Sequence, residues 1–413
     1  NSYVTIPRAA NSFDNTEIAA NVDEDIIDSL TGGRLVGSVT SFENFAECPL
    51  RYYLRYGVDL KEREEFTFSP VNFGVVLHAV IREVCDEIKK NGESYYLISE
   101  EKRREMVKRS VAAITDIYQN SILKDSSRNS FMIKRMEDLA DRTVWAMGEQ
   151  LKCGDFVPFV FEHKFNMEVG DGDRKQLMSG TIDRVDICEN GTDVYVRIID
   201  YKTGKKDFNI VKTYYGIDIQ LMVYMEAAMK LVAKTRPGKN VIPAGVFYYN
   251  ISDPIVSATT ESAEEIEDKI KGELRLKGMV NSDKDIAEKM DNTEGTSLNI
   301  PVSRKADGGF DSRRSKVMNT EQFNILGRFV DVRAIDTADR IVGGDIRRSP
   351  YKDGQFSSCD RCPYGAVCGF SVDLPGCNYR KLKKFDDEVL WNNIKEGVDE
   401  NGKKMDTGAE ERD

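Results

Sequence analysis

The stretch "GTIDRVDICENGTDVYVRIIDYKTGKK", residues 180–206, decides the fold class, because two alternating apolar and polar runs flank an Asn-Gly pair. Residues 176–188 and 193–204 each have the period of two that is typical of a half-buried strand. Asn190-Gly191 is the strongest short signal for a hairpin, because both residues tolerate a positive φ. The sequence therefore predicts an antiparallel hairpin here.

The register of this hairpin decides where its acidic residues meet. A two-residue turn at Asn190-Gly191 places Asp183 opposite Ile198, with Asp200 as its diagonal neighbour on the same face. A register shifted by one residue separates the two carboxylates, and a shift by two places Asp183 directly opposite Asp200. We therefore expect two carboxylates close together, and such a pair repels unless a cation compensates it.

Paired carboxylates of this kind favour a magnesium site. Mg²⁺ prefers oxygen ligands and takes them from a few carboxylates, water and substrate phosphates. Lys202, two residues after Asp200, could orient an attacking water and neutralise charge developing on a phosphate. The hairpin thus predicts metal-assisted phosphodiester hydrolysis, and the alternative is a polar, solvent-facing side of a sheet.

Around the hairpin, the periodicity predicts a mixed α/β fold in which helices flank a sheet core. The expected strands are 156–169, the two hairpin strands and 241–251, and the expected helices lie at 72–92, within 99–152, at 218–234 and at 320–342. Residues 252–318 are polar and charged, and we expect helix in part and loop otherwise.

Four further residues are candidates for the site. His78 lies on the helix 72–92 and Glu162 lies in the strand before the hairpin, so either could be an additional metal ligand. Gln220 and Tyr224 are four residues apart and hence on one face of a helix. The alternative is structural, since a lone histidine on an amphipathic helix is usually packed or capping and Gln and Tyr are common interface residues.

Composition bounds the class of protein. The chain has 413 residues, eight cysteines and no apolar run long enough for a signal peptide or a membrane span. Cysteines at this density favour metal binding and buried thiols in a reducing cytoplasm. We expect residues 1–36 to be a linker or the cut edge of a longer chain, and residues 381–413 to be a mobile tail.

The net charge of -11 argues against a general electrostatic affinity for nucleic acid. Local basic groups at 102–109, 201–206 and 311–316 could still form a positive surface. Each of them alone is typical of a solvated face.

The order of the motifs resembles the RecB-family nuclease domain of the PD-(D/E)xK superfamily, over residues 37–380 with a helical segment at 75–152. The motifs in question are Gly74-x-x-x-His78, Glu162, Gly180-x-x-Asp183-Arg184, Asp200-Tyr201-Lys202-Thr203-Gly204 and Gln220-x-x-x-Tyr224.

The resemblance implies a role for each matching residue. Asp183, Asp200, His78 and the carbonyl of Tyr201 would bind the metal, and Lys202 would be the catalytic lysine. Gln220 and Tyr224 would lie on the helix beside the site, where they contact DNA or support the catalytic residues. Glu162 is less certain, because the family is looser there.

The segment "SSCDRCPYGAVCGF", residues 357–370, holds three cysteines, and three thiolates do not close a four-ligand site. The family carries a [4Fe-4S] cluster held by one cysteine upstream of the nuclease motifs and three downstream. The resemblance therefore implies an iron-sulfur staple made by Cys48, Cys359, Cys362 and Cys368. Zinc is the alternative for the same ligands, and Cys377 is the rival ligand.

The resemblance is strongest to the AddB-type branch of this family. It implies a Mg²⁺-dependent DNA exonuclease that cuts the 5′-ended strand and works with an AddA-like helicase-nuclease subunit in double-strand break repair and recombination. Two alternatives are a stand-alone exonuclease of the CRISPR-associated type and a non-enzymatic, cluster-stapled scaffold that binds DNA ends or a subunit.

Overall fold

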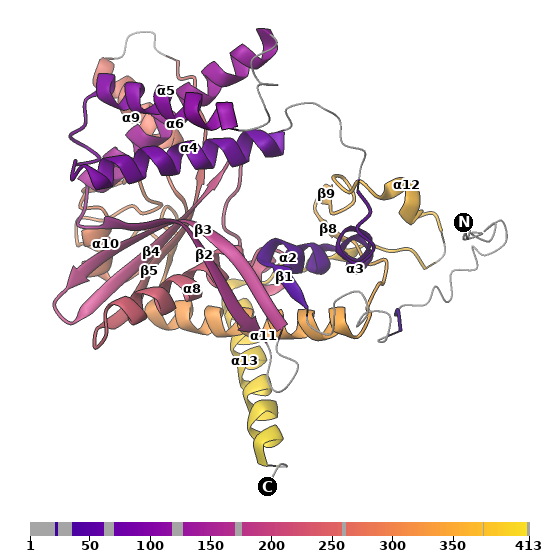
Figure 1. The fold of residues 1–413 in the computed structure, drawn as a ribbon. Coiled ribbons are helices and arrows are strands. Elements are labelled where there is room, and N and C mark those ends of the chain that lie inside the picture. Colours follow the sequence, from indigo (N-terminus) through magenta and orange to yellow (C-terminus); the bar gives the residue numbers. More distant parts are fainter. Residues whose placement is uncertain are drawn as a thin grey trace.

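The computed structural model shows a mixed α/β fold in which helices cover both faces of a sheet (Figure 1), as the sequence predicts. The residues that the structure describes are 21–23, 35–61, 70–117, 127–169, 176–257, 262–374 and 376–410. The expected linker at 1–36 therefore lies almost entirely outside them. Within the described helices, none is long and apolar enough to cross a membrane.

The main sheet, as far as the chain is described, has seven strands in the order β1-β3-β4-β5-β6-β7, with β2 also paired to β3. The pairs β2–β3, β3–β4 and β5–β6 are antiparallel, whereas β1–β3, β4–β5 and β6–β7 are parallel. The strands are β1 (Val36–Ser38), β2 (Val157–Val169), β3 (Gln176–Asn190), β4 (Asp193–Lys202), β5 (Asn240–Asn250), β6 (Lys277–Asn281) and β7 (Val317–Met318).

The central strand β3 opens a gap at the residues that carry the chemistry. Strand β2 pairs with β3 along nearly its whole length and so occupies one edge. On the other edge, β1 pairs with residues 177–179 and β4 pairs from Arg184 onward. Residues 180–183 therefore have no strand neighbour on that edge within the described chain, and Asp183 lies in the gap.

The hairpin turn lies one residue later than predicted. Asn190 pairs with Asp193, so the two turn residues are Gly191 and Thr192, and Gly191 has a φ of 61°. Glycine at the first central position is the requirement of a type II′ turn. Because both Asn and Gly are turn formers, their order in the sequence left the register open. The observed register, extended by one pair, places Asp183 opposite Asp200 instead of opposite Ile198.

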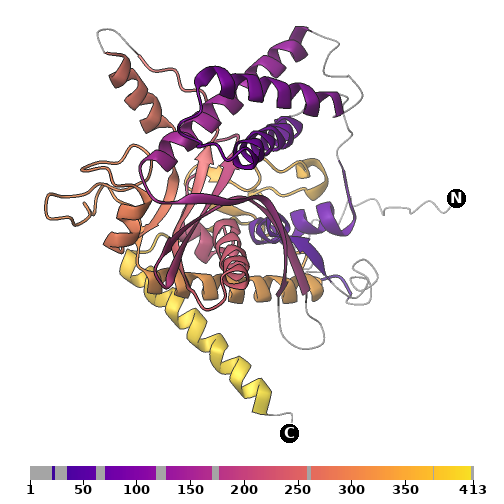
Figure 2. The same cartoon turned by 60° about the vertical axis from the view of Figure 1, so that its left-hand side comes forward.

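Helices form layers on the two faces of the sheet, as Figure 1 shows and Figure 2 repeats from a second direction. The layer on one face contains α4 (Pro70–Lys90), α5 (Glu100–Ile117) and α6 (Ser127–Lys152), and the layer on the other contains α8 (Gln220–Thr235) and α11 (Thr320–Val342). The remaining helical segments are α2 (Val39–Glu47), α3 (Pro49–Tyr52), η1 (Tyr53–Gly57), α7 (Ile210–Tyr214), α9 (Ala263–Glu273), α10 (Lys284–Met290), α12 (Gly365–Cys368) and α13 (Asp387–Glu410).

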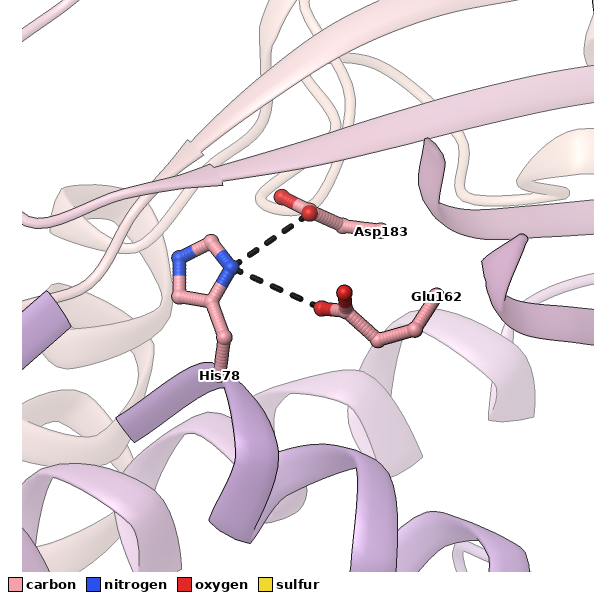
Figure 3. Close-up of side chains that lie close together, drawn as sticks. All are labelled: His78, Glu162 and Asp183. Atoms are coloured by element: carbon pink, nitrogen blue, oxygen red, sulfur yellow. Dashed lines mark ion pairs between the residues drawn. The ribbon is translucent and has the colours of Figure 1, made fainter. Parts of the chain in front are cut away.

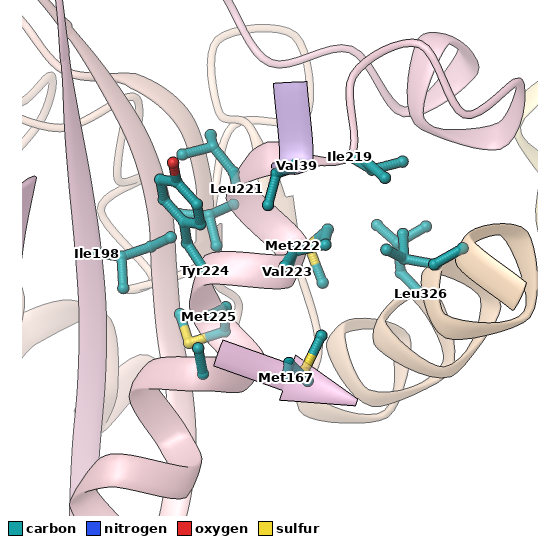
Figure 4. Close-up of a cluster of buried hydrophobic side chains, with 14 of the residues drawn as sticks. Val39, Met167, Ile198, Ile219, Leu221, Met222, Val223, Tyr224, Met225 and Leu326 are labelled. Carbon is teal, nitrogen blue, oxygen red and sulfur yellow. The ribbon is translucent and has the colours of Figure 1, made fainter. Parts of the chain in front are cut away.

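Each face of the sheet has its own hydrophobic core. On the α8 side, Ile198 of β4 packs with Val223 of α8 and Leu326 of α11 (Figure 4). On the α4 side, Leu77 and Phe247 belong to a second cluster of buried side chains. Alternation along β4 and β5 supplies both cores, since successive residues of a strand point to opposite faces. The sheet is therefore held rigidly from both sides.

Local capping explains where several helices begin. Ser38 caps α2 by accepting a hydrogen bond from the N–H of Ser41. Asn319 and Gln322 form a reciprocal capping box at the start of α11. Helix α8 differs, because its N-cap residue is Ile219, whose side chain has no hydrogen-bonding group.

Two expectations from the sequence need correction. The polar segment 252–318 contributes β6 and β7 to the sheet, which the short runs between charged residues concealed. The tail that we expected to be mobile forms α13, which packs on α11, with Leu390 and Ile394 buried. Their spacing of four residues places both on one helix face, and that face covers the core. A second, small sheet contains β8 (Tyr351–Asp353), β9 (Phe356–Ser357) and β10 (Arg380–Lys381).

Candidate active site

Three side chains from three elements converge at the gap in β3 (Figure 3). His78 comes from α4, Glu162 from β2 and Asp183 from β3, and one ligand atom of each lies within 4.8 Å of the others. The Nδ1 of His78 is 3.3 Å from Oδ1 of Asp183 and 3.6 Å from Oε1 of Glu162. No other group of three potential ligands in the described chain is as compact. One nitrogen and two carboxylates suit a divalent cation.

The histidine in this group is held between two negative charges. Burial alone lowers the pKa of His78, but hydrogen bonds to Asp183 and Glu162 outweigh it and raise the pKa to about 10. The imidazolium thus occupies the place of a cation between the carboxylates. A bound metal ion would take over this compensation and leave His78 as a neutral ligand.

Glu162 enters the group from an unusual backbone conformation. Its φ is 48°, whereas a positive φ is uncommon for any residue but glycine. Its neighbours Phe161 and His163 pair with Arg184 and Ile182, so Glu162 faces Asp183 across the ladder. Conformational strain of this kind occurs mainly at functional sites.

Asp183 is fixed by the strand beside it. The β3–β4 ladder ends at Arg184 and Ile199, and beyond that pair the N–H of Tyr201 donates to Oδ2 of Asp183 at 2.6 Å. One carboxylate oxygen thus replaces a ladder acceptor, and the other faces His78. The backbone of Tyr201, proposed as a ligand through its carbonyl, therefore lies beside the three-ligand group.

Asp200 and Lys202 form a second group next to the first. The Nζ of Lys202 lies 2.5 Å from Oδ2 of Asp200 and donates to Oε1 of Gln220 at 3.0 Å. Gln220 in turn donates from Nε2 to the hydroxyl of Tyr224 at 2.9 Å. Burial, and then the charge of Asp183, raises the pKa of Asp200 to about 7. Asp200 is near Asp183 but outside the compact three-ligand group, where Glu162 stands instead.

A buried network behind Lys202 escaped the sequence analysis. Lys206 lies 3.0 Å from Oδ1 of Asp218, which also accepts a hydrogen bond of 2.6 Å from the hydroxyl of Tyr248. Glu43 of α2 accepts from the N–H groups of Ile219 and Gln220 at 2.9 and 3.0 Å. Burial raises the pKa of Glu43 to about 7, although Lys206 acts in the opposite direction. The only available signal was the polar "YKTGKK" run.

The four cysteines of the expected staple come together. Burial comes first among the causes that raise the pKa of Cys359 to about 11, and the nearby Cys48, Cys362 and Cys368 add to it. All eight cysteines of the chain are free thiols. Around these cysteines, the N–H of Leu50 donates to the carbonyl of Arg347 and the hydroxyl of Tyr364 donates to the carbonyl of Leu60. The segments that carry Cys48 and the three later cysteines are thus packed together.

A cavity of about 990 Å³ begins directly after Lys202. Thr203 and Gly204 line it, together with residues of α4, α6, β5 and β6. Three of its cations, Arg135, Lys205 and Lys277, have no ion-pair partner among the described residues. Two of its carboxylates, by contrast, are paired with cations outside the lining, Asp207 with Lys316 and Asp253 with Arg142. The cavity therefore has a surplus of positive charge beside the catalytic groups.

Known proteins share this sequence and this site. Proteins named as the B-type subunit of an ATP-dependent helicase/deoxyribonuclease are 33% identical over 380 residues in Thermoanaerobacter pseudethanolicus, 34% over 399 in Lachnoclostridium phytofermentans and 32% over 403 in Clostridium botulinum. These alignments cover 89%, 94% and 95% of this chain and 33%, 34% and 35% of the relatives. The chain thus spans about a third of the length of the relatives it matches.

The model of a protein family matches a larger part of the chain than any single motif. It is the model of the PD-(D/E)XK nuclease superfamily, and it covers residues 37–369. The match begins at β1 and α2 and ends just after Cys368, so it includes both groups of active-site residues. By its sequence, its mixed sheet and the residues in the gap of β3, this chain belongs to the PD-(D/E)XK nuclease superfamily.

Proposed function

We propose that this chain is a Mg²⁺-dependent DNA nuclease, the nuclease domain of an AddB-like subunit. The observation that carries the proposal is the meeting of His78, Glu162 and Asp183 in one compact group beside Lys202. Two carboxylates and an imidazole fit a divalent cation, and the lysine is in place to act on a phosphate.

The chain's own residues divide the chemistry between them. A bound Mg²⁺ would polarise the scissile phosphate and lower the pKa of a bound water. Lys202 is aimed by Asp200 and Gln220, and its ammonium neutralises charge that develops on the phosphate. Asp183 is held in place by the N–H of Tyr201.

The cavity after Lys202 supports a single DNA strand as the substrate. Its three unpaired cations, Arg135, Lys205 and Lys277, offer contacts to successive phosphates. Phe73 and Met132 supply apolar surface in the same cavity. This local positive charge reconciles DNA binding with a net charge of -11.

The relatives' names and the resemblance extend the proposal beyond this chain. We propose an AddA-like helicase-nuclease subunit as its partner, double-strand break repair and recombination as its process, and the 5′-ended strand as its substrate. The cytoplasm is the proposed location, where a nuclease meets bacterial DNA and where free thiols persist.

We propose that Cys48, Cys359, Cys362 and Cys368 hold a [4Fe-4S] cluster. The four thiols fit such a group, because they are mutual neighbours and free. Tetrahedral zinc with Zn–S bonds of about 2.3 Å draws its four sulfurs to within roughly 4 Å of each other. No three of these cysteines lie within 4.8 Å of one another, so the wider spacing supports a cluster over a single zinc ion.

The experiment that tests the proposal is a cleavage assay on single-stranded DNA labelled at either end. The purified chain is incubated with Mg²⁺ or with EDTA, alone and with an AddA-like subunit. We expect Mg²⁺-dependent cleavage that EDTA abolishes, and in the complex a preference for the 5′-ended strand. Absence of cleavage under all of these conditions, with the metal bound, would favour a non-enzymatic scaffold.

A further inference from the structure

The helix that carries Gln220 and Tyr224 begins without a cap of its own. Ile219 is the N-cap residue of α8, and its side chain cannot accept a hydrogen bond. The first N–H groups of a helix need an acceptor from elsewhere, and they favour a negative charge. In this chain the acceptor comes from a distant part of the sequence.

Glu43 of α2 supplies that acceptor. Its Oε1 accepts from the N–H of Ile219 at 2.9 Å and from the N–H of Gln220 at 3.0 Å. The two segments are more than 170 residues apart, and the side chain of Glu43 is partly buried between them. A single oxygen thus fixes the backbone from which the Gln220 side chain projects.

The same backbone sets the position of Lys202. Gln220 offers Oε1 to the Nζ of Lys202 at 3.0 Å, while its Nε2 is engaged by the hydroxyl of Tyr224. The other neighbour of Lys202 is Asp200, at 2.5 Å. A continuous series of contacts therefore runs from Glu43 through Gln220 to the catalytic ammonium.

The residues around Glu43 keep the start of α8 in place from the other side. Asp218, directly before Ile219, binds Lys206 and the hydroxyl of Tyr248, and its carbonyl accepts from Thr213. The loop before α8 is anchored by these contacts whether or not Glu43 is present. Removing the Glu43 carboxylate should therefore disturb the first turn of α8 and leave the fold intact.

We propose that Glu43 is a positioning residue of the nuclease: its carboxylate caps α8 and so holds Gln220, and through it Lys202, in the geometry for phosphodiester hydrolysis. The inference rests on the proposed nuclease function. Glu43 touches neither the three-ligand group nor the cavity lining, so its effect is on the rate and not on metal or DNA binding.

The first test compares two substitutions that differ in one atom type. Glu43→Gln keeps an acceptor oxygen at the same place, and Glu43→Met has similar length but no acceptor. We expect Glu43→Met to lower kcat at least about ten-fold on single-stranded DNA with Mg²⁺, because small displacements of catalytic groups are costly. KM, metal affinity and iron content should stay near the wild-type values, and Glu43→Gln should retain most of the rate. Glu47→Met, on the same helix, is the matched control and should match the wild type.

The second test is a double-mutant cycle with Gln220→Leu. If Glu43 acts through Gln220, adding Glu43→Met to Gln220→Leu slows the enzyme by no more than about two-fold further, since coupled residues are not additive. Multiplicative losses would overturn the inference, as would a loss of rate in Glu43→Gln equal to that in Glu43→Met.

A readout without catalysis separates this inference from the proposed function. Amide hydrogen exchange at Ile219 and Gln220 should speed up in Glu43→Met and not in Glu47→Met. Unchanged exchange would overturn the cap, and faster exchange with an unchanged rate of cleavage would overturn the positioning role. A wild-type chain that binds metal and cuts no DNA would overturn the proposed function, and the inference would fall with it.

Discussion

Glu162 places its Oε1 3.6 Å from Nδ1 of His78 while its own backbone holds a φ of 48°. Non-glycine residues adopt such a conformation at a cost, and the surrounding structure must compensate it. The site thus trades conformational free energy for a third ligand.

Glu162→Gly should therefore stabilise the fold and weaken metal binding. Glycine adopts a positive φ freely, so we expect a gain of about 1 kcal/mol in the free energy of unfolding. Removing a carboxylate ligand should lower Mg²⁺ affinity at least about ten-fold. Lys164→Gly, at an exposed position of the same strand with no positive φ, is the control and should lose stability. Thermal melting and calorimetric Mg²⁺ titration check both expectations, and a less stable Glu162→Gly protein would contradict the account of strain.

Charge reversal in the cavity should weaken DNA binding in a salt-dependent manner. Arg135→Glu and Lys205→Glu each remove an unpaired cation from the lining, so we expect KM for single-stranded DNA to rise about three- to ten-fold at moderate ionic strength. The slope of affinity against salt should fall by about one for each cation. Lys234→Glu, at the far end of α8, is the control. Equal effects of all three substitutions would contradict a specific strand path.

Loss of an upstream cysteine should release the staple. Cys48→Ser should lose the iron and lower the melting temperature, because Cys48 links a segment near the start of the fold to Cys359, Cys362 and Cys368. Cys377→Ser should keep both, since Cys377 is not among the thiols that influence Cys359. Iron analysis, visible absorption and melting curves measure the outcome. Full iron content in Cys48→Ser would show that a different residue is the fourth ligand.

A carboxyl pair between α8 and α11 should make stability depend on pH. Burial, and then a hydrogen bond with Glu226, raises the pKa of Asp331 to about 8. The folded state therefore holds this proton more tightly than the unfolded chain, so its contribution to stability is present at low pH and is lost as the pH rises toward 8. Asp331→Asn cannot lose a proton, and its melting temperature should exceed that of the wild type increasingly between about pH 4 and 8. Glu321→Gln, at an exposed position of the same helix, should show no such trend, and a pH-independent difference for Asp331→Asn would contradict the shared proton.

The sequence predicted the elements with a strong period and missed those whose position depends on distant contacts. The strands around Asp183 and Asp200 follow from alternation, and the two acidic residues meet as expected. The register was off because Asn190 and Gly191 are both turn formers, and only the fold decides which of them takes the positive φ.

The part of the site that could not be predicted involves tertiary contacts. Nothing local to Glu43 indicates that it caps a helix more than 170 residues away. The strain at Glu162 is a backbone property that no residue type announces. Leu390 and Ile394 lie among charged residues, and their burial depends on α11 being present.

The most direct test of the central claim separates metal binding from catalysis at two neighbouring residues. Asp183→Asn keeps an acceptor for the N–H of Tyr201 and removes the ligand charge, whereas Lys202→Met removes the ammonium beside Asp200. The measurement is calorimetric Mg²⁺ titration together with cleavage of single-stranded DNA by the same preparations. We expect Asp183→Asn to lose both, and Lys202→Met to keep metal binding while its cleavage rate falls by about two to three orders of magnitude. Wild-type Mg²⁺ affinity in Asp183→Asn, or wild-type cleavage by Lys202→Met, would contradict the account.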